Sequence, residues 1–448
     1  MAKVTSLSLY LFIIIINFDF ISNILEIPLK PMKVKGIPKY KNLTIIEQGK
    51  KILGNNTAMF YDQGDSIINE ELVFLANVKI GSKSKDFNLL LDTGSKVLWV
   101  AIEGCIGSYK IDTFFNPSSS STCNYVGKKF EIEYGTGYCT GFYFSDYIEY
   151  LPKRKFKLNF GVASVAFFNV TRADGIIGLA KYYEDESESF IHMLKKSGNT
   201  DSLAFSIKFE NDYFKSDVKG TMYIGEHDDF SLSGVSSCTL YSNTNFWACT
   251  LNSFSMKSSN TEVVSKIKTG IIFDTGTNAI ILPIKYYNDI KNQLSKFGCF
   301  GVEATEVSII CSANGNVPDL RFQFGEKTLI IPKEYGFGPI KIDNKYVKSV
   351  VVFNGELSII GSVFFFLFHT LFDSEKNEMK FYPLKDGLIE GGLSTFVIIL
   401  ICIASIAVVV LIVFTVIYCV KIRKKNNDMP TEALRKDYYD SLFPNTTN

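Results

Sequence analysis

Two aspartates in matching surroundings are the side chains of this sequence best suited to do chemistry. The motifs that contain them are Asp92-Thr93-Gly94-Ser95 and Asp274-Thr275-Gly276-Thr277. Each motif follows a run of three apolar residues that predicts a buried strand, and each glycine predicts a sharp turn behind it. One such motif is common turn chemistry. Two copies favour a single site to which both carboxylates belong.

A second landmark repeats at nearly the same interval. Asp174–Leu179 reads Asp-Gly-Ile-Ile-Gly-Leu, and Leu357–Ser362 reads Leu-Ser-Ile-Ile-Gly-Ser. The two aspartates are 182 positions apart, and the glycines Gly178 and Gly361 are 183 apart. The chain is therefore interpreted as a tandem of two similar lobes, each of which contributes one aspartate to a shared site.

Two neighbouring carboxyl groups can divide the work of acid and base. When they are close enough to share one proton, they do not both ionise easily. One stays an acid while the other is a base, so together they can deprotonate a water and protonate the carbonyl oxygen that this water attacks. The expected reaction is hydrolysis by general acid-base catalysis, without a covalent intermediate.

The sequence resembles the pepsin-like aspartic proteases from about Glu71 to Pro383. The shared motifs occur in that family's order: the first aspartate motif with Leu98-Trp99-Val100, the hairpin Tyr134-Gly135-Thr136-Gly137, the second aspartate motif with Leu282-Pro283, both apolar-apolar-Gly elements and Phe372-Asp373. The resemblance implies an all-β, bilobal pepsin-like fold of two similar β lobes with the active site in the cleft between them. It also implies an aspartic endopeptidase that hydrolyses peptide bonds in extended protein segments.

The resemblance assigns roles to individual residues. It implies that Asp92 and Asp274 are catalytic, and that the hairpin is a flap whose tyrosine is Tyr134. Thr93, Thr275 and Trp99 are implied to support the site. The residues implied to bind substrate are Gly94, Ser95, Tyr134, Gly135, Thr136, Gly276 and Thr277. Asn278 stands where the family most often has serine, so the corresponding hydrogen bond to substrate is not predicted. The abundance of Lys, Asn, Ile and Phe resembles the plasmepsins of apicomplexan parasites.

The amino-acid composition argues against several other classes of function. The 448 residues are 46% hydrophobic and 14% aromatic, which is enough to bury two cores and favours strands. The net charge is +1 and no basic block is interleaved with aromatic residues, so nucleic acid is not an expected partner. None of the three histidines has the spacing of a metal site, and no Gly-x-Ser-x-Gly element occurs. We expect no metal and no cofactor.

The first 67 residues predict a signal and a prosegment. Residues 1–22 carry Lys3 and the apolar run Leu9–Ile16, which suits a signal peptide, or an uncleaved signal anchor because the cleavage context is poor. Seven lysines against two glutamates give residues 26–53 a net charge of 7 − 2 = +5. The segment 23–67 is either a solvated leader or, as the resemblance implies, a basic prosegment that covers the aspartates.

The rest of the chain is divided into an N-terminal β lobe at 68–200, a C-terminal β lobe at 201–384, a transmembrane helix at 396–420 and a cytosolic tail at 421–448. The 25 residues 396–420 carry no charge, and the basic stretch Lys421-Ile422-Arg423-Lys424-Lys425 follows at once. This order predicts one membrane span with a cytosolic C-terminus. We expect a type I membrane protein of the secretory or endosomal pathway or the cell surface, with lumenal or extracellular lobes.

Three short motifs fit this topology. Asn55-Asn56-Thr57 and Asn169-Val170-Thr171 are glycosylation sequons on the expected lumenal side. In the tail, Tyr439-Asp440-Ser441-Leu442 matches a pattern that sorting adaptors read, which makes such an adaptor a candidate partner.

Seven of the nine cysteines lie on the expected lumenal side, where disulfides can form. The family resemblance implies a disulfide between Cys299 and Cys311. Cys238 and Cys249 flank a predicted hairpin that they could bridge. The remaining lumenal cysteines are Cys105, Cys123 and Cys139. The first two would close the loop after the first aspartate motif and leave the third odd, although the third could replace either partner.

Two other functions fit a pepsin-like fold: a catalytically inactive peptide-binding protein and a sorting receptor that uses its tail. Inactive relatives usually lose an aspartate, the glycine of the motif or the flap tyrosine, and this sequence keeps all three. An active endopeptidase is therefore the preferred interpretation. The sequence does not predict the substrate, the subsite preference or the pH optimum.

Overall fold

The computed structural model describes residues 25–34, 71–107, 111–134, 137–167, 173–181, 185–210, 219–232, 234–241, 244–259, 261–303, 307–338, 340–342, 345–391, 408–421 and 438. Outside these residues lie the predicted signal, most of the predicted prosegment, Gly135 and Thr136 of the predicted flap, both sequons and the tail motif at 439–442. The chain divides into two units between Glu390 and Gly391.

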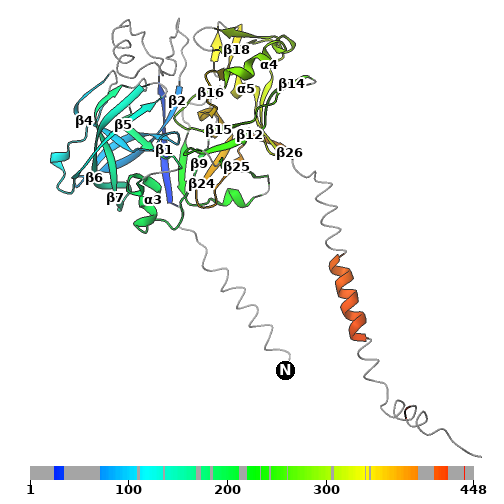
Figure 1. Cartoon of the computed structure of the whole chain (residues 1–448), viewed down its shortest axis with the longest axis horizontal. Helices are drawn as coiled ribbons and strands as arrows, with labels where there is room; N and C mark the ends of the chain where they lie inside the picture. Colours follow the sequence, from blue (N-terminus) through cyan, green and yellow to red (C-terminus); the bar gives the residue numbers. More distant parts are fainter. Residues whose placement is uncertain are drawn as a thin grey trace, which may run out of the picture. The chain divides into compact units, whose positions relative to one another are not determined.

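Strands make up most of the described part of the first unit (Figure 1). The largest sheet among these residues has 13 strands. Their order is β11-β25-β24-β9-β10-β1-β2-β3-β8-β4-β7-β6-β5. In chain order the bounds are β1 Leu25–Val34, β2 Glu71–Ile80, β3 Lys85–Asp92, β4 Trp99–Ile106, β5 Asn124–Tyr134, β6 Gly137–Leu151, β7 Arg154–Phe167, β8 Gly175–Gly178, β9 Ala204–Phe209, β10 Gly220–Ile224, β11 Ser236–Thr239, β24 Phe368–Asp373 and β25 Glu378–Pro383.

Two smaller sheets complete the second half of this unit. The first has eight strands in the order β12-β15-β23-β16-β22-β18-β17, with β21 paired to β22, and the other has five in the order β14-β13-β19-β20-β26. Their bounds are β12 Ala248–Leu251, β13 Ser253–Ser258, β14 Thr261–Ser265, β15 Thr269–Phe273, β16 Ile280–Leu282, β17 Cys299–Glu303, β18 Val307–Ser312, β19 Asp319–Phe324, β20 Lys327–Ile331, β21 Ile340–Ile342, β22 Tyr346–Phe353, β23 Ile359–Ile360 and β26 Leu388–Gly391.

The helices of the first unit are short and connect strands. The longest is α3, which begins where the Ser189 side chain accepts a hydrogen bond from the backbone of His192. The α-helices are α3 Phe190–Lys196, α4 Tyr287–Lys291 and α5 Lys333–Gly336, and the 3-10 helices are η1 Pro117–Ser119, η2 Glu186–Glu188, η3 Asp228–Ser231, η4 Ile284–Tyr286, η5 Leu294–Phe297 and η6 Ser362–Phe366.

Alternation of apolar and polar residues explains why these segments are strands. In β7, Phe156, Leu158 and Phe160 are buried, while Lys155 and Lys157 between them are exposed. A period of two places one side of a strand against the core. As expected from the sequence, strands are the main elements of the described residues.

The repeat read from the sequence has a structural counterpart in each half. The strand that ends in the first aspartate, β3, pairs in parallel with β8, so that Asp92 faces Gly178. In the second half β15 pairs in parallel with β23, so that Phe273 faces Ile360. In each half, therefore, the strand that leads into the aspartate motif has a parallel neighbour from the repeated apolar-apolar-Gly element.

β1 lies inside the segment 23–67 and is an interior strand of the large sheet. Its first residues pair with β10, from Leu25 opposite Ile224 to Leu29 opposite Gly220, and its later residues pair with β2. Leu25, Ile27 and Leu29 are buried in the main core. This part of the chain is folded into the large sheet and bridges β10 to β2.

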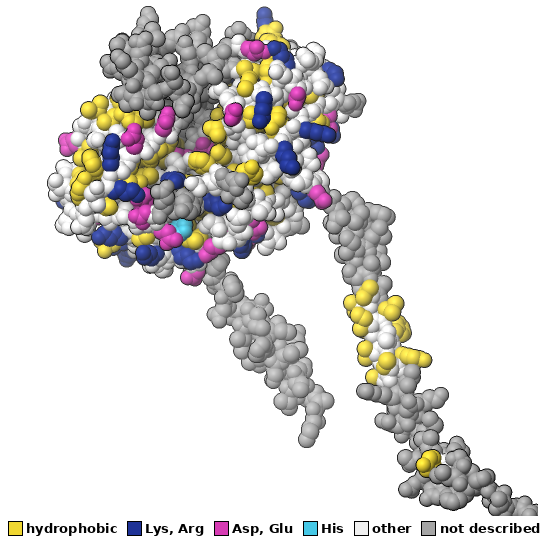
Figure 2. Space-filling model, viewed as in Figure 1, with side chains coloured by type: hydrophobic (Ala, Val, Ile, Leu, Met, Phe, Trp, Pro, Cys, Tyr) yellow, Lys and Arg dark blue, Asp and Glu magenta, His cyan; other side chains and the backbone are white. Residues whose placement is uncertain are grey.

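The second unit is described over the helical residues 408–421, drawn in orange-red in Figure 1. Apolar side chains cover this helix (Figure 2), and each is exposed, from 46% at Val410 to 69% at Leu411. Over the described residues, no helix combines the length and the apolar character that a membrane crossing requires.

Candidate active site

The two aspartate motifs interlock through their threonines. The Thr93 amide donates to Thr275 Oγ1 at 3.2 Å, and the Thr275 amide donates to Thr93 Oγ1 at 3.1 Å. Each hydroxyl donates in turn to a carbonyl of the other half, Thr93 to Phe273 at 2.8 Å and Thr275 to Leu91 at 2.7 Å. These four buried hydrogen bonds fix the two motifs against each other with near twofold symmetry.

The interlocked turns bring each carboxylate against the glycine of the other motif. A Cβ atom added to Gly94 would lie 2.7 Å from Cγ of Asp274, and one added to Gly276 would lie 2.8 Å from Oδ1 of Asp92. Such separations are too short for a side chain, so only glycine permits the approach. The structure therefore places both sequence-predicted aspartates in one site.

Short hydrogen bonds hold both carboxylates in place. Oδ1 of Asp92 accepts from the Gly94 amide at 2.9 Å. Oδ1 of Asp274 accepts from the Gly276 amide at 2.8 Å, and its Oδ2 accepts from Thr277 Oγ1 at 2.6 Å. The roles expected of Gly94, Gly276 and Thr277 thus include orienting the carboxylates themselves.

The two aspartates differ in burial. Asp92 is 5% exposed, whereas Asp274 is partly exposed. Burial raises the pKa of Asp92 well above its usual value, and the neighbouring Asp274 carboxylate raises it further. The pair therefore retains a proton, held on Asp92, at a pH where an isolated aspartate would be ionised.

Two further glycines explain why the apolar-apolar-Gly elements repeat with the aspartates. A Cβ atom on Gly178 would lie 2.4 Å from the Val97 nitrogen, and one on Gly361 would lie 2.4 Å from the Thr277 carbonyl oxygen. The residues behind these glycines bond to the same turns, since the Ala180 amide donates to the Ser95 carbonyl and the Ser362 amide donates to the Thr277 carbonyl. Each glycine lets a second strand support the turn behind an aspartate.

The predicted flap tyrosine lies beside the first aspartate motif. Tyr134, the last residue of β5, accepts a hydrogen bond from Trp99 Nε1 at 2.9 Å. Burial raises the pKa of Tyr134, and the nearby Asp92 carboxylate raises it further. The buried Ser95 hydroxyl lies close enough to Asp92 and Tyr134 to lower the pKa of both, although it does not reach ideal hydrogen-bond geometry with either.

The structure locates some of the remaining predicted substrate contacts. Gly135 and Thr136 lie outside the described residues. Asn278, which stands in place of the family's serine, has a buried Oδ1 that accepts no hydrogen bond from the residues that the structure describes.

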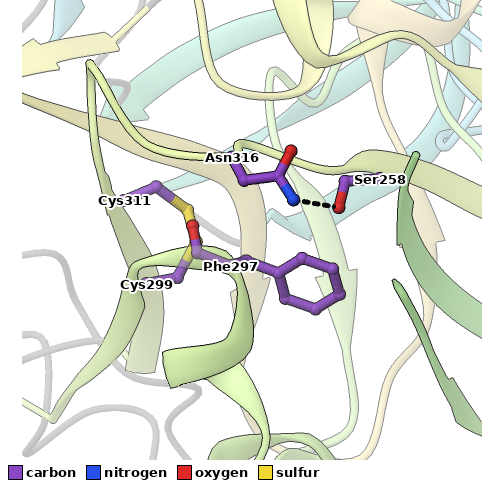
Figure 3. Close-up of a disulfide and its surroundings, with 5 residues drawn as sticks. All are labelled: Ser258, Phe297, Cys299, Cys311 and Asn316. Carbon is purple, nitrogen blue, oxygen red and sulfur yellow. Dashed lines mark hydrogen bonds between the residues drawn. A yellow bond between two sulfur atoms is a disulfide. The ribbon is translucent and has the colours of Figure 1, made fainter. Parts of the chain in front are cut away.

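Two of the three expected disulfides are present. Cys238 is bonded to Cys249, and Cys299 is bonded to Cys311. Figure 3 shows the second disulfide joining β17 to β18, with the Asn316 amide donating to Ser258 Oγ nearby at 2.7 Å. Both expectations are confirmed.

The expected disulfide between Cys105 and Cys123 is wrong. Both are free thiols, as is the buried Cys139. Cys105 packs against a smaller core cluster that contains Trp99 and Cys139, whereas Cys123 packs against the main core. Because they face different cores, their thiols do not meet, and proximity in the sequence was a poor guide.

Sequence spacing also missed a cluster of ionisable groups in the large sheet. Asp229 Oδ2 lies 2.7 Å from Lys208 Nζ, 2.9 Å from His369 Nδ1 and 3.5 Å from His227 Nδ1. Ligand atoms of the carboxylate and the two histidines lie within 4.8 Å of one another. However, the Lys208 ammonium group already binds Asp229 Oδ2, where a metal cation would bind. Burial lowers the pKa of His369 to about 3. We interpret the cluster as a self-neutralised ion network that joins β9, β24 and η3.

Comparison with known proteins agrees with this geometry. The family model described as eukaryotic aspartyl protease matches residues 73–384. The chain belongs to this family. It is 26% identical over 385 residues to gastricsin of Homo sapiens, a match that covers 80% of this chain and 95% of the relative. It is 27% identical over 379 residues to pepsin A of Callithrix jacchus, covering 77% of this chain and 92% of the relative.

Membership of the aspartyl protease family makes this chain, by class, an aspartic endopeptidase that acts on protein or peptide substrates. The matched region contains both aspartate motifs, Tyr134 and both disulfides. It ends at residue 384, before β26 and the apolar run at 396–420.

Proposed function

We propose that Asp92 and Asp274 are the catalytic pair of a membrane-anchored endopeptidase that cleaves extended segments of proteins. The observation that carries this proposal is the threonine interlock, which fixes each carboxylate against the glycine of the other motif. Burying two neighbouring carboxylates costs free energy. A catalytic function would explain why the fold holds them together.

The reaction begins with one proton on the pair and a water between the two carboxyl groups. The ionised carboxylate takes a proton from the water while the water oxygen bonds to the scissile carbonyl carbon, and the carbonyl oxygen takes the proton of the other carboxyl group. The resulting diol then breaks its C–N bond as the nitrogen is protonated. Asp274 accepts hydrogen bonds at both oxygens, so it is well placed to carry the charge while Asp92 holds the proton.

Substrate binding would use the hairpin of β5 and β6 together with the turns behind the aspartates. Tyr134 joins this hairpin to Trp99 and so to the first aspartate motif. Main-chain groups of a hairpin tip pair naturally with an extended peptide. We infer that Gly135 and Thr136 complete this contact.

The same proposal covers the membrane span, the cellular location and the N-terminal segments. The uncharged run 396–420 and the basic stop behind it, together with the exposed apolar side chains between Val408 and Val420, support one span in a type I membrane protein of the secretory or endosomal pathway or the cell surface. The proposal also includes a signal at 1–22 and a prosegment at 23–67. It further includes glycosylation at Asn55 and Asn169, a sorting adaptor that binds at Tyr439, and a plasmepsin-like identity.

The test compares peptide cleavage by the full chain, purified in detergent after removal of the prosegment, with that of its variants. Asp92→Asn and Asp274→Asn keep the shape of the side chain but remove an ionisable group, so each should reduce turnover at least 1,000-fold. Asp86→Asn is the matched control, because Asp86 lies on the same strand β3 but pairs with Lys79 at the surface. Full activity of Asp274→Asn would refute the paired mechanism. A folded but inactive wild type would favour the peptide-binding protein.

A further inference from the structure

The chain that follows the family domain returns to the second lobe before it leaves the first unit. The Leu384 amide donates to the Leu367 carbonyl at 2.9 Å, and the Gly387 amide donates to the Leu384 carbonyl at 3.0 Å. A Cβ atom on Gly387 would lie 2.0 Å from the Leu367 carbonyl oxygen, so the backbones are in close contact. Residues 388–391 then form β26, which extends the five-stranded sheet beside β20.

We call residues 384–391 the strap. Side chains also hold the strap against the rest of the unit. Tyr335 Oη donates to Asp386 Oδ2 at 2.8 Å. The largely buried Arg321 of β19 binds Glu390 through both of its terminal nitrogens. Ile389 packs against the main core. A bidentate arginine-carboxylate pair adds direction as well as attraction, so the last described residues of the unit are held in a fixed path.

The strap limits how far the second lobe can move from whatever follows it. Five Cα steps separate Gly391 from Phe396, where the uncharged run begins, and they span at most about 18 Å. Without the strap, twelve steps from Leu384 would span about 43 Å. A docked strap thus shortens the tether of the active site by more than half.

We propose that the strap makes this protease favour substrates tethered in the same membrane, which it cuts in extended segments close to the bilayer. The inference rests on the proposed function, because it needs both the peptidase and the membrane span. A short tether raises the local concentration of segments within its reach and excludes those beyond it. The chemical class of substrate is therefore a membrane-attached protein with an unfolded segment beside its own anchor.

The test uses the full chain reconstituted in liposomes with single-span reporter proteins. Each reporter carries the same cleavable sequence at 5, 15, 30 or 60 residues from its own span. The wild type should cut within a narrow range of spacers. A 20-residue Gly-Ser insertion between Gly391 and Gly392 should raise cleavage of the disfavoured spacers at least threefold, while kcat/KM for a soluble peptide of the same sequence stays unchanged.

A second variant releases the strap without lengthening the chain. Gly387→Ala with Glu390→Gln removes the close backbone approach and the arginine pair, and should broaden the spacer range in the same way. It should also speed trypsin cleavage after Lys385. Glu303→Gln is the control, since Glu303 is an exposed carboxylate of the same lobe that pairs with Lys291, and it should behave as the wild type.

The outcomes separate this inference from the proposed function. Equal spacer dependence in the wild type, the insertion variant and the strap variant would overturn the role of the strap, even with full activity on soluble peptide. Loss of cleavage of every substrate, soluble peptide included, would instead reject the peptidase itself.

Discussion

The two aspartates occupy equivalent motifs but unequal surroundings. Asp92 is buried beside Tyr134 and Ser95, while Asp274 is partly exposed and accepts hydrogen bonds at both oxygens. A pair that must hold one proton needs such a difference, because two carboxyl groups in identical sites would share the proton equally. Part of the asymmetry lies in the last residue of each motif, because the Thr277 hydroxyl donates to Asp274, and part lies in neighbours such as Tyr134 beside Asp92.

The raised pKa of Asp92 should make the fold less stable as the pH rises. The unfolded chain ionises Asp92 near pH 4, but the folded chain keeps it protonated to higher pH. Stability is therefore fully present below about pH 4 and is lost as the pH rises through the folded pKa. Asp92→Asn does not titrate, so its melting temperature should exceed that of the wild type by a few degrees at pH 7 and match it more closely at pH 3.

Thermal unfolding of the wild type and Asp92→Asn across this pH range measures the effect. Asp86→Asn, on the same strand at the surface, is the matched control for replacing an aspartate by asparagine. A difference between Asp92→Asn and the wild type that does not change with pH would contradict the raised pKa.

Tyr134 should contribute to positioning but not to proton transfer. Tyr134→Phe removes the oxygen that accepts from Trp99, and kcat/KM should fall about 2- to 10-fold, the range of one hydrogen bond. Tyr134→Ala also removes the ring and should fall further, yet remain well above Asp274→Asn. Tyr125→Ala, an exposed position on the same strand, serves as the control. Activity of Tyr134→Ala as low as that of Asp274→Asn would contradict this role.

At the scale of elements, Gly178 and Gly361 are the points where the supporting strands touch the aspartate turns. Because a Cβ atom at either would overlap backbone, Gly178→Ala and Gly361→Ala should each cost about 1–3 kcal/mol in the free energy of unfolding. Gly270→Ala is the control within β15, since its new Cβ would meet only the ring of Tyr241 at 3.2 Å. Denaturant unfolding measures all three, and equal losses would show that the close approaches carry no special cost.

The three free thiols of the first unit give a direct test of the strand arrangement. Alkylation of the denatured, unreduced protein followed by peptide mass analysis should label Cys105, Cys123 and Cys139. The cysteines of the two disulfides should take label only after reduction. Unlabelled Cys105 together with unlabelled Cys123 would restore the pairing that the structure contradicts.

These elements also show where sequence reasoning works for this chain and where it stops. The aspartate motifs and the hairpin of β5 and β6 follow from local patterns, and the structure contains them. Local patterns carry no information on partners distant in the chain. They therefore did not show that β1 sits between β10 and β2, that Cys105 and Cys123 face different cores, or that His227 and His369 meet at Asp229.

At the scale of the whole molecule, the first unit contains everything needed for the proposed chemistry. The large sheet runs from β11 near residue 236 to β5 near residue 130, so strands from both halves share one set of backbone hydrogen bonds. β1 completes this sheet from within the predicted prosegment. Its removal would leave β10 and β2 without a partner along these edges, so activation by cleavage would require another strand to replace it.

The last prediction concerns how the whole chain is placed in a membrane. If residues 396–420 span once with the basic stretch at 421–425 on the cytosolic side, the positive-inside rule puts the lobes in the lumen. Protease added to sealed microsomes should then remove only the residues after the span, and a tag at the C-terminus should be lost while an antibody to the lobes still detects them. In a host that glycosylates, Asn55→Gln and Asn169→Gln should each remove one endoglycosidase-sensitive shift. Detergent provides the control, because opening the vesicles should expose the lobes as well. Digestion of the lobes in sealed vesicles, with the C-terminal tag protected, would reverse the topology, since the active site would then face the cytosol.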